Sequence, residues 1–228
     1  MRLMVIDTAL GLCTVGVFEV DARGARPLGV RSEPMVKGHS ERIAGFARDA
    51  AAQAGLAFAD LDRIGVTVGP GSFTGLRVGL AFAQGLAAAL DRPVVGVSAL
   101  DALAASASEA SEVAALIDAR RGQVYARFWR DGEADGVAEA LTLEAAAARI
   151  EAMGAGAVLI GSGAALFSEV SADMTILSLD GPAPAGLARL AATAHPAAAP
   201  ARPLYLRAPD ATPPTRLPGQ ARAPARVP

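Results

Sequence analysis

The stretch "VTVGPGSFTGLRVGLAFAQGLAAAL", from Val66 to Leu90, joins the end of an apolar strand, a glycine-rich loop and an apolar helix in direct succession. Within the loop, three glycines fall between Gly69 and Gly75. Backbone N–H groups at the start of such a helix can bind an anion. A loop of this kind can equally turn the chain sharply so that two segments pack closely. These residues alone leave both interpretations open.

The segments around this stretch predict a mixed α/β lobe. Short links join the first three strand-like runs, which favours an antiparallel meander, and Gly55 is suited to close the first helix. Three antiparallel strands followed by helix, strand, helix and strand is the order of the ribonuclease-H-like lobe, the unit of actin-like and sugar-kinase folds. The strands are expected at Arg2–Asp7, Cys13–Val20, Leu28–Met35, Arg63–Gly69 and Arg92–Ser98, and the helices at about Ser40–Ala54 and Phe73–Leu90.

A second, thinner lobe is expected after the first. We therefore divide the chain into an N-terminal lobe over 1–101, a smaller C-terminal lobe over 102–207 and a tail over 208–228. The tail is rich in Pro, Ala and Arg without periodicity, which predicts disorder. The elements of the second lobe are expected to be a hairpin of Val113–Arg120 and Gln123–Arg130, a helix at Leu143–Met153, strands at Ala157–Gly163 and Thr175–Leu179, and a helix from about Ala185.

Composition and charge set limits on the function. The 228 residues carry 21 Lys and Arg against 23 Asp and Glu, and this balance does not favour nucleic-acid binding by the chain alone. The single cysteine, Cys13, excludes an internal disulfide and fits a reducing cytoplasm, and its apolar strand predicts a buried, inert thiol. Asp7 interrupts the apolar start, so we expect no signal peptide. No apolar run approaches the ~20 residues that a bilayer crossing needs. We expect a cytoplasmic protein without membrane contact.

The glycine loop matches no established phosphate-binding motif. The Gly-Lys-Ser/Thr ending of a Walker A loop is missing, and the nearest cation is Arg77. Pro70 followed by Gly71 predicts a type II turn in which Gly71 takes a positive φ. Ser72 or Thr74 is expected to cap the helix. The candidate anion or nucleotide loop comprises Asp7, Thr8, Gly69, Gly71, Ser72 and Thr74.

No set of side chains predicts catalysis by this chain. Nucleases of this fold pair a carboxylate such as Asp7 with another at the end of the fourth strand, which here ends at Gly69, so a two-metal site is not expected. The two histidines, His39 and His195, are too few for a His-rich metal site, and no serine has an evident base. The adjacent Arg120 and Arg121 sit at a hairpin, either in water or against a phosphate or carboxylate. We expect no catalytic and no metal-ligating residue.

A row of small residues marks the helix behind the loop. Gly75, Gly79, Ala83 and Ala87 recur every four residues, so another backbone can approach this face closely. Packing on the protein's own sheet is one interpretation, but the helix is apolar on several sides, which favours a partner helix. The predicted interface residues are Ile43, Phe46 and Ala50 on the first helix and Leu76, Gly79, Leu80, Ala83 and Leu86 on the second.

Taken with other segments, the loop "GPGSFTGLRVG" closely resembles that of the TsaB (YeaZ) family, part of the wider glycoprotease-like group that includes TsaD. The resemblance spans Met1 to about Ala211 in the expected order. The supporting segments are "MRLMVIDTA" at the start, "HSERI" from His39, "GVSAL" from Gly96, "IDARRGQVY" from Ile117 and "PLYLRAPDA" from Pro203.

The resemblance implies an actin-like ATPase (ASKHA) architecture with two ribonuclease-H-like lobes, the second reduced. It implies a non-catalytic dimerisation subunit that supports TsaD in transferring threonylcarbamoyl to the adenosine beside the anticodon of tRNA. The two helices above would then dock on the same helices of TsaD, TsaE would join the pair, and tRNA would bind the assembly. The chain itself would hold no cofactor, whereas the complex uses ATP and a metal on TsaD. When TsaD is absent, the same face could form a homodimer.

One departure from TsaD concerns its metal site. TsaD carries an HxxxH motif directly after the fifth strand, where this chain has Ser98 and Ala102. Since these side chains cannot hold a metal as histidines do, the catalysis of TsaD is not carried over. The alternative function is an ATP-binding actin-like phosphotransferase or a glycoprotease-type peptidase, which would require ATP turnover or peptide cleavage by the isolated chain.

Overall fold

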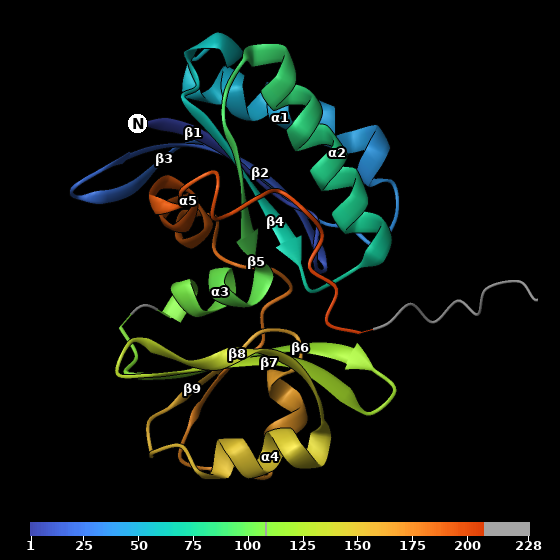
Figure 1. Cartoon of the computed structure of the whole chain (residues 1–228), viewed down its shortest axis with the longest axis vertical. Helices are drawn as coiled ribbons and strands as arrows, with labels where there is room; N and C mark the ends of the chain where they lie inside the picture. The colour runs from blue at the N-terminus through green and yellow to red at the C-terminus, as the bar shows by residue number, and fades with distance from the viewer. Residues whose placement is uncertain (108, 208–228) are drawn as a thin grey trace, which may run out of the picture.

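The computed structural model describes residues 1–107 and 109–207, which form two five-stranded sheets lying one above the other (Figure 1). In the first sheet the strand order is β3-β2-β1-β4-β5, with β1 to β3 antiparallel and with β4 and β5 parallel to β1. This is the predicted ribonuclease-H-like order. The strands are β1 Arg2–Asp7, β2 Leu12–Asp21, β3 Gly24–Pro34, β4 Arg63–Gly69 and β5 Val94–Ser98.

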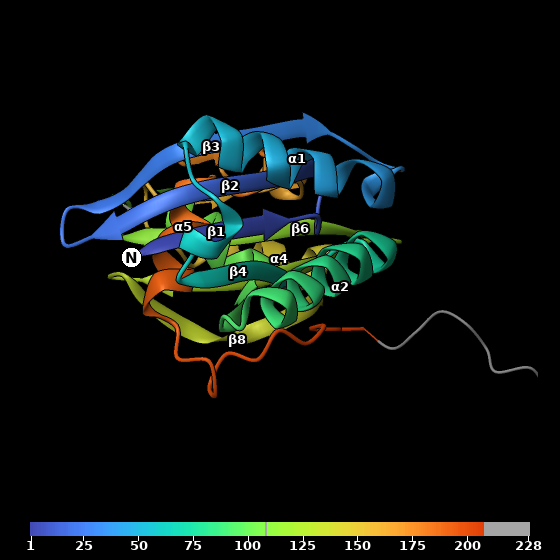
Figure 2. The same ribbon diagram turned by 90° about the horizontal axis from the view of Figure 1, so that it is seen from above.

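Helices cover both faces of the first sheet, as Figures 1 and 2 show. Helices α1 (His39–Ala54) and α2 (Phe73–Leu90) lie side by side on one face, and α5 (Pro184–Thr193) packs on the other. Successive residues of β1 point to opposite faces, so Met4 packs with the α1 and α2 side and Leu3 packs with the α5 side. Burial of both faces explains why β1 is a continuous apolar run rather than an alternating one.

The second sheet repeats the topology of the first. Its order is β10-β9-β6-β7-β8, with β6 to β8 antiparallel and with β9 and β10 parallel to β6. The lobe is reduced, because β9 and β10 have three residues each. Helix α3 (Ala99–Ala104) lies between the sheets, and α4 (Leu143–Glu151) packs on β7 and β8. The strands are β6 Glu112–Arg120, β7 Gln123–Arg130, β8 Glu133–Thr142, β9 Val158–Ile160 and β10 Thr175–Leu177. The predicted fold of two ribonuclease-H-like lobes is confirmed.

Two elements were not expected from the sequence. Strand β8 contains Asp135 and Gly136, two residue types that are uncommon in strands. It lies at the edge of the second sheet, and none of its side chains is fully buried. Its register comes from β7, to which it pairs from Gln123 opposite Thr142 to Arg130 opposite Glu133. Helix α3 is short, and its apolar residues lie between two sheets, so it lacks the one-sided pattern of a surface helix.

The expected C-terminal lobe over 102–207 requires a correction, because the chain returns to the first lobe after β10. Helix α5 packs on the first sheet, and the segment 199–207, hereafter the C-terminal segment, runs back along it. Gly96 N donates to Ala199 O at 2.9 Å, and Leu204 N donates to Val68 O at 2.7 Å. Such contacts between distant segments leave no local signal in the sequence. The predicted disordered tail, 208–228, lies outside the described residues.

By length and composition alone, α2 is the one described helix that could cross a membrane, although no apolar run of that length was expected. A third of its residues are buried in the structure, against the first sheet and α1. The core helix of a globular lobe has the same composition, and this is the role that the packing gives to α2.

Arg63 ties α5 to the first sheet, and its removal should be costly. One guanidinium nitrogen, Nη1, donates to the carbonyl oxygens of Ala191, Ala192 and Ala194 at 2.8 Å each. We expect Arg63→Leu to lower the free energy of unfolding by about 2 kcal/mol, because hydrogen bonds from a charged donor contribute roughly 1.5–3 kcal/mol. Urea denaturation followed by circular dichroism measures the change. Arg26→Leu, which removes an exposed ion pair with Glu19, is the control and should change stability by less than about 1 kcal/mol.

Candidate subunit interface and glycine loop

The glycine loop sets the start of α2. Ser72 is the N-cap, and its side chain accepts a hydrogen bond from Gly75 N at 3.2 Å, as predicted for one of two candidates. The other candidate, Thr74, is exposed within the first turn. The predicted type II turn is wrong, because the positive φ of 107° belongs to Gly69 rather than Gly71, and the Gly69–Pro70 peptide is cis.

The loop lies in direct contact with the chain between β1 and β2. Ser72 N donates to Ala9 O at 2.7 Å, and Thr8 Oγ1 donates to Gly75 O at 2.8 Å. A Cβ on Gly71 would lie 2.1 Å from Ala9 O, and a Cβ on Gly75 would lie 2.1 Å from Thr8 O. Glycine is therefore needed for close backbone approach. Of the two interpretations left open by the sequence, this geometry supports tight packing.

Asp7 closes the end of β1 and is only 2% exposed. Its Oδ1 accepts from Thr67 Oγ1 at 2.7 Å and from Ala9 N at 3.0 Å. Burial raises the pKa of the Asp7 carboxyl, although both hydrogen bonds act to lower it. Among the described residues Oδ2 has no partner. Of the six candidate loop residues, the structure thus brings Asp7, Thr8, Gly71 and Ser72 together around Ala9.

The raised pKa of Asp7 predicts a pH-dependent effect of Asp7→Asn. The unfolded chain ionises near the ordinary pKa, whereas folded Asp7 holds its proton to a higher pH, so wild-type stability falls as pH rises between the two values. Asparagine keeps an oxygen for Thr67 and Ala9 but cannot ionise. We expect the stability of Asp7→Asn relative to wild type to increase from pH 4 to pH 7.5 in urea denaturation. A relative stability that stays constant or declines over this range would contradict the assignment.

Most of the residues predicted for the interface are buried inside the chain's own fold. The row of Gly75, Gly79, Ala83 and Ala87 faces the protein's own first sheet and is buried. A bulky side chain at Gly79 would disturb the fold, since its Cβ would lie 2.3 Å from Thr8 Oγ1. Leu86 is half-buried and packs on the same core. The other predicted residues, all buried in the folded chain, are Ile43, Phe46, Ala50, Leu76, Gly79, Leu80 and Ala83.

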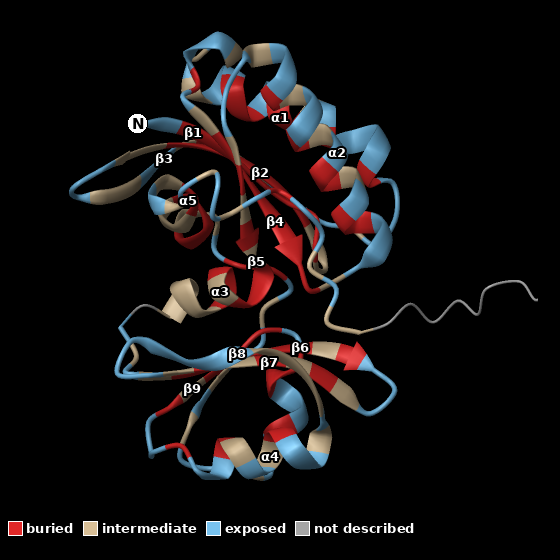
Figure 3. Ribbon diagram, in the orientation of Figure 1, coloured by how far each residue is buried: buried red, intermediate tan, exposed pale blue. Residues whose placement is uncertain are grey.

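A different face of α2 is exposed and carries no charged side chain. Between Val78 and Leu90 the helix carries no charged residue, and a Cβ on Gly85 would meet nothing within 4 Å. Figure 3 shows exposed residues along the outer side of α2, next to α1. We call this face the outer strip and define it as Thr74, Val78, Ala81, Gly85 and Ala88, of which only Val78 is half-buried. The spacing between these five residues alternates between four and three positions, which is the spacing along the contact line of two paired helices.

Other chemically notable residues lie apart from the outer strip. Cys13 is buried, and burial is the main cause that raises the pKa of its thiol to about 11, as fits the inert thiol that we predicted. His39 is 5% exposed and lies at the first position of α1. Arg120 is 85% exposed and pairs with Asp118 at 3.1 Å. Ser98 is the N-cap of α3, and its side chain accepts from Asp101 N at 3.4 Å.

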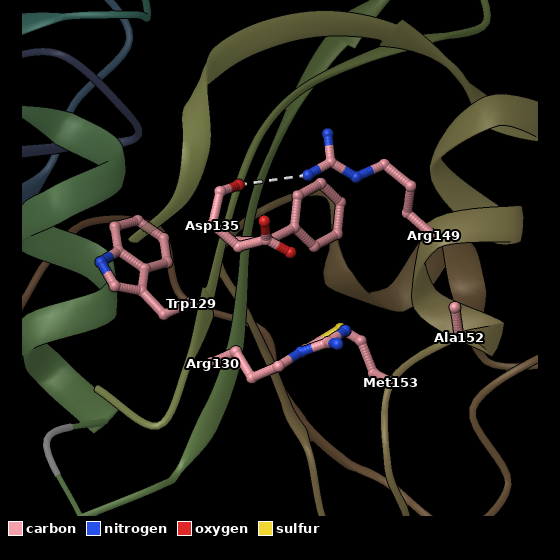
Figure 4. A pocket seen from close by; sticks show the side chains of 7 residues that line it. Trp129, Arg130, Asp135, Arg149, Ala152 and Met153 are labelled. Carbon is pink, nitrogen blue, oxygen red and sulfur yellow. Dashed lines mark hydrogen bonds between the residues drawn. The ribbon is translucent and has the colours of Figure 1, made fainter. Parts of the chain in front are cut away.

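The second lobe contains a pocket of about 150 Å³ between β7, β8 and α4 (Figure 4). The Arg149 guanidinium lies 4.0 Å from the centroid of the Phe128 ring and donates to Asp135 O at 3.3 Å. It also pairs with Glu139 at 2.6 Å. The Arg149 guanidinium is thus engaged by Phe128, Asp135 O and Glu139, and the residues predicted for a site lie elsewhere. No group of three or more His, Cys, Asp or Glu that could hold a metal occurs among the described residues.

Two sheets of ribonuclease-H-like topology with α3 between them define the actin-like ATPase (ASKHA) class. A hexokinase of the ROK type from Thermus thermophilus shares this fold, with a TM-score of 0.51 and 17% identity over 85% of this chain and 98% of that one. The family model "TsaD: tRNA N6-adenosine threonylcarbamoyltransferase" matches residues 19–173. A crystal structure from Pseudomonas aeruginosa, described as an uncharacterized protein with similarity to peptidase YEAZ, has a TM-score of 0.76 and 32% identity over 90% of this chain and 99% of that one. The chain belongs to the TsaB (YeaZ) branch of the TsaD family.

Relatives of similar sequence extend the comparison. The Escherichia coli "tRNA threonylcarbamoyladenosine biosynthesis protein TsaB" is 37% identical over 58% of this chain and 56% of its own length. This chain therefore aligns with about half of that relative. An uncharacterized protein of Mycobacterium tuberculosis is 36% identical over 92% of this chain and 93% of its own length.

Proposed function

We propose that this chain acts in tRNA N6-threonylcarbamoyladenosine synthesis as a non-catalytic subunit. It binds TsaD and supports the transfer of threonylcarbamoyl to the adenosine beside the anticodon. The outer strip of α2 is the observation that carries this proposal. An exposed, uncharged helix face with small side chains is suited to close pairing with another helix.

The shape of the outer strip favours a specific kind of partner. Ala81, Gly85 and Ala88 let a second helix approach closely, and neither of the flanking charges, Arg77 and Asp91, lies within the strip. TsaD belongs to the same family, so its corresponding helices are the natural counterpart in a two-fold-like arrangement. A second copy of this chain is the competing counterpart when TsaD is absent.

The packing of the glycine loop supports a non-catalytic role. The loop glycines contact Thr8 and Ala9 through backbone atoms, and Asp7 Oδ1 is engaged by Thr67 and Ala9. These groups act as structural contacts at the place where an actin-like phosphotransferase would need open loops. We therefore place ATP and the metal on the other subunits. TsaE joins the pair, tRNA binds through the complex, and the complex works in the cytoplasm.

Reconstitution tests the proposal. Purified TsaD, TsaE and the carbamoyl-adenylate synthase are mixed with unmodified tRNA and ATP, with and without this chain, and the modified nucleoside is quantified by mass spectrometry. We expect product formation to depend on the chain and on TsaD together. Equal product without the chain would refute the role. ATP hydrolysis or peptide cleavage by the isolated chain would instead favour the phosphotransferase or peptidase alternative.

A further inference from the structure

Two exposed aromatic rings meet at the start of α2. Phe73 is 51% exposed and Tyr205, from the C-terminal segment, is 47% exposed. Their ring centroids lie 5.6 Å apart with an interplanar angle of 31°. Figures 1 and 2 show the C-terminal segment passing this end of α2. They are the only aromatic side chains among the large, exposed apolar residues of the described chain.

The fold holds this aromatic pair in place without burying it. Leu204 N donates to Val68 O at 2.7 Å, and the Arg207 side chain donates through Nη1 to Ala119 O at 3.0 Å, so residues on both sides of Tyr205 are held to the folded chain. Phe73 directly follows the N-cap Ser72. A preorganised ring loses little conformational entropy when a ligand stacks on it. The pair therefore has the properties of a binding platform.

One cation, Arg77, lies directly against the aromatic pair. The Arg77 guanidinium lies 3.8 Å from the centroid of the Phe73 ring, and its Nε lies 3.4 Å from Tyr205 Oη. Within residues 1–107 and 109–207, Arg77 pairs with no carboxylate. Arg207 connects this edge to the β6–β7 hairpin, where Arg120 is 85% exposed and pairs with Asp118. Phe73, Tyr205 and Arg77 thus combine a stacking surface with a cation, which is the chemistry that binds unpaired nucleotides.

We propose that Phe73, Arg77 and Tyr205 form a stacking site for an unpaired base of RNA. The base lies on the Tyr205 ring, and Arg77 neutralises an adjacent phosphate. This inference rests on the proposed function, since tRNA is the RNA that the complex modifies. Tyr and Arg are also common in protein interfaces, but the guanidinium of Arg77, which pairs with no carboxylate among the described residues, favours an anionic ligand. The chain has a net charge of −2, so this single site is expected to add affinity within the complex rather than to bind tRNA tightly alone.

Three variants test the stacking site. Tyr205→Leu removes the ring and keeps apolar bulk, Tyr205→Phe keeps the ring, and Arg77→Gln removes the charge. The dissociation constant of unmodified, fluorescent tRNA is measured by anisotropy for the chain mixed with TsaD and for the chain alone. We expect Tyr205→Leu to weaken binding about 5- to 150-fold, which is the range for loss of one stacked base. Tyr205→Phe should stay within about twofold, and Arg77→Gln should reduce the salt dependence by about one phosphate contact.

Co-elution of each variant with TsaD is measured in parallel. A wild-type chain that does not co-elute refutes the proposed pairing, and the titration of the chain alone then decides the stacking site separately. The stacking site is refuted if Tyr205→Leu binds tRNA like wild type. The stacking site is also refuted if Tyr205→Leu no longer co-elutes with TsaD, Tyr205→Phe still does, and the affinity for tRNA falls only where TsaD is lost. In that case Tyr205 would contact TsaD rather than RNA.

Discussion

The Gly75→Ala variant is expected to lose about 3 kcal/mol of unfolding free energy. The added Cβ would lie 2.1 Å from Thr8 O, a backbone atom directly after β1. Thr8 cannot withdraw easily, because Asp7 is paired to β2 and held by Thr67. Overpacking of a tight core typically costs 1–3 kcal/mol, and a rigid backbone neighbour places this substitution at about the upper end.

Gly85→Ala on the same helix is the matched control and should have the opposite effect. A Cβ at Gly85 meets nothing within 4 Å, and alanine is favoured over glycine in a helix by about 1 kcal/mol. Urea denaturation of both variants, followed by circular dichroism, measures the two changes. If both glycines tolerated alanine equally, the assignment of the inner and outer faces of α2 would be incorrect.

Most of the fold could be predicted from local patterns, because the central strands of both lobes are strongly apolar and are joined in a simple order. The strand run Arg63–Gly69 and the helix Phe73–Leu90 were found at their observed bounds. The return of α5 to the first sheet could not be foreseen, because its anchor is a long-range contact. Arg63 bonds to carbonyls about 130 positions further along the chain, and nothing near Arg63 in the sequence indicates this.

The candidate interface failed for a different physical reason. Helix α2 is apolar on several sides, so its periodicity identifies faces but not which face meets the sheet. The row containing Gly75 and Gly79 and the row containing Ala81 and Gly85 both present small residues at helical spacing. Small residues permit close approach by the protein's own backbone as readily as by a partner. Only the contact of Gly75 with Thr8 shows which row is turned inward.

The Ala81→Arg variant is expected to lose TsaD binding, because Ala81 lies in the outer strip. Ala81 is exposed near the middle of the strip, so arginine there would not disturb the core of this lobe. In a helix-to-helix contact, however, the side chain would fill the space of closest approach and bury a charge without a partner, which costs several kcal/mol. We expect the affinity for TsaD to fall at least about 100-fold, which corresponds to about 2.7 kcal/mol.

Ala148→Arg provides a control with the same change of side chain on an exposed position of α4, in the second lobe. We expect this variant to bind TsaD like wild type and to support tRNA modification fully, whereas Ala81→Arg should fail in both assays while unfolding at wild-type urea concentrations. Isothermal titration calorimetry with TsaD measures the affinities. Because both substitutions add the same charge and bulk, a difference between them depends on location alone. The reverse result, with Ala148→Arg defective and Ala81→Arg normal, would move the docking surface from the outer strip to the second lobe.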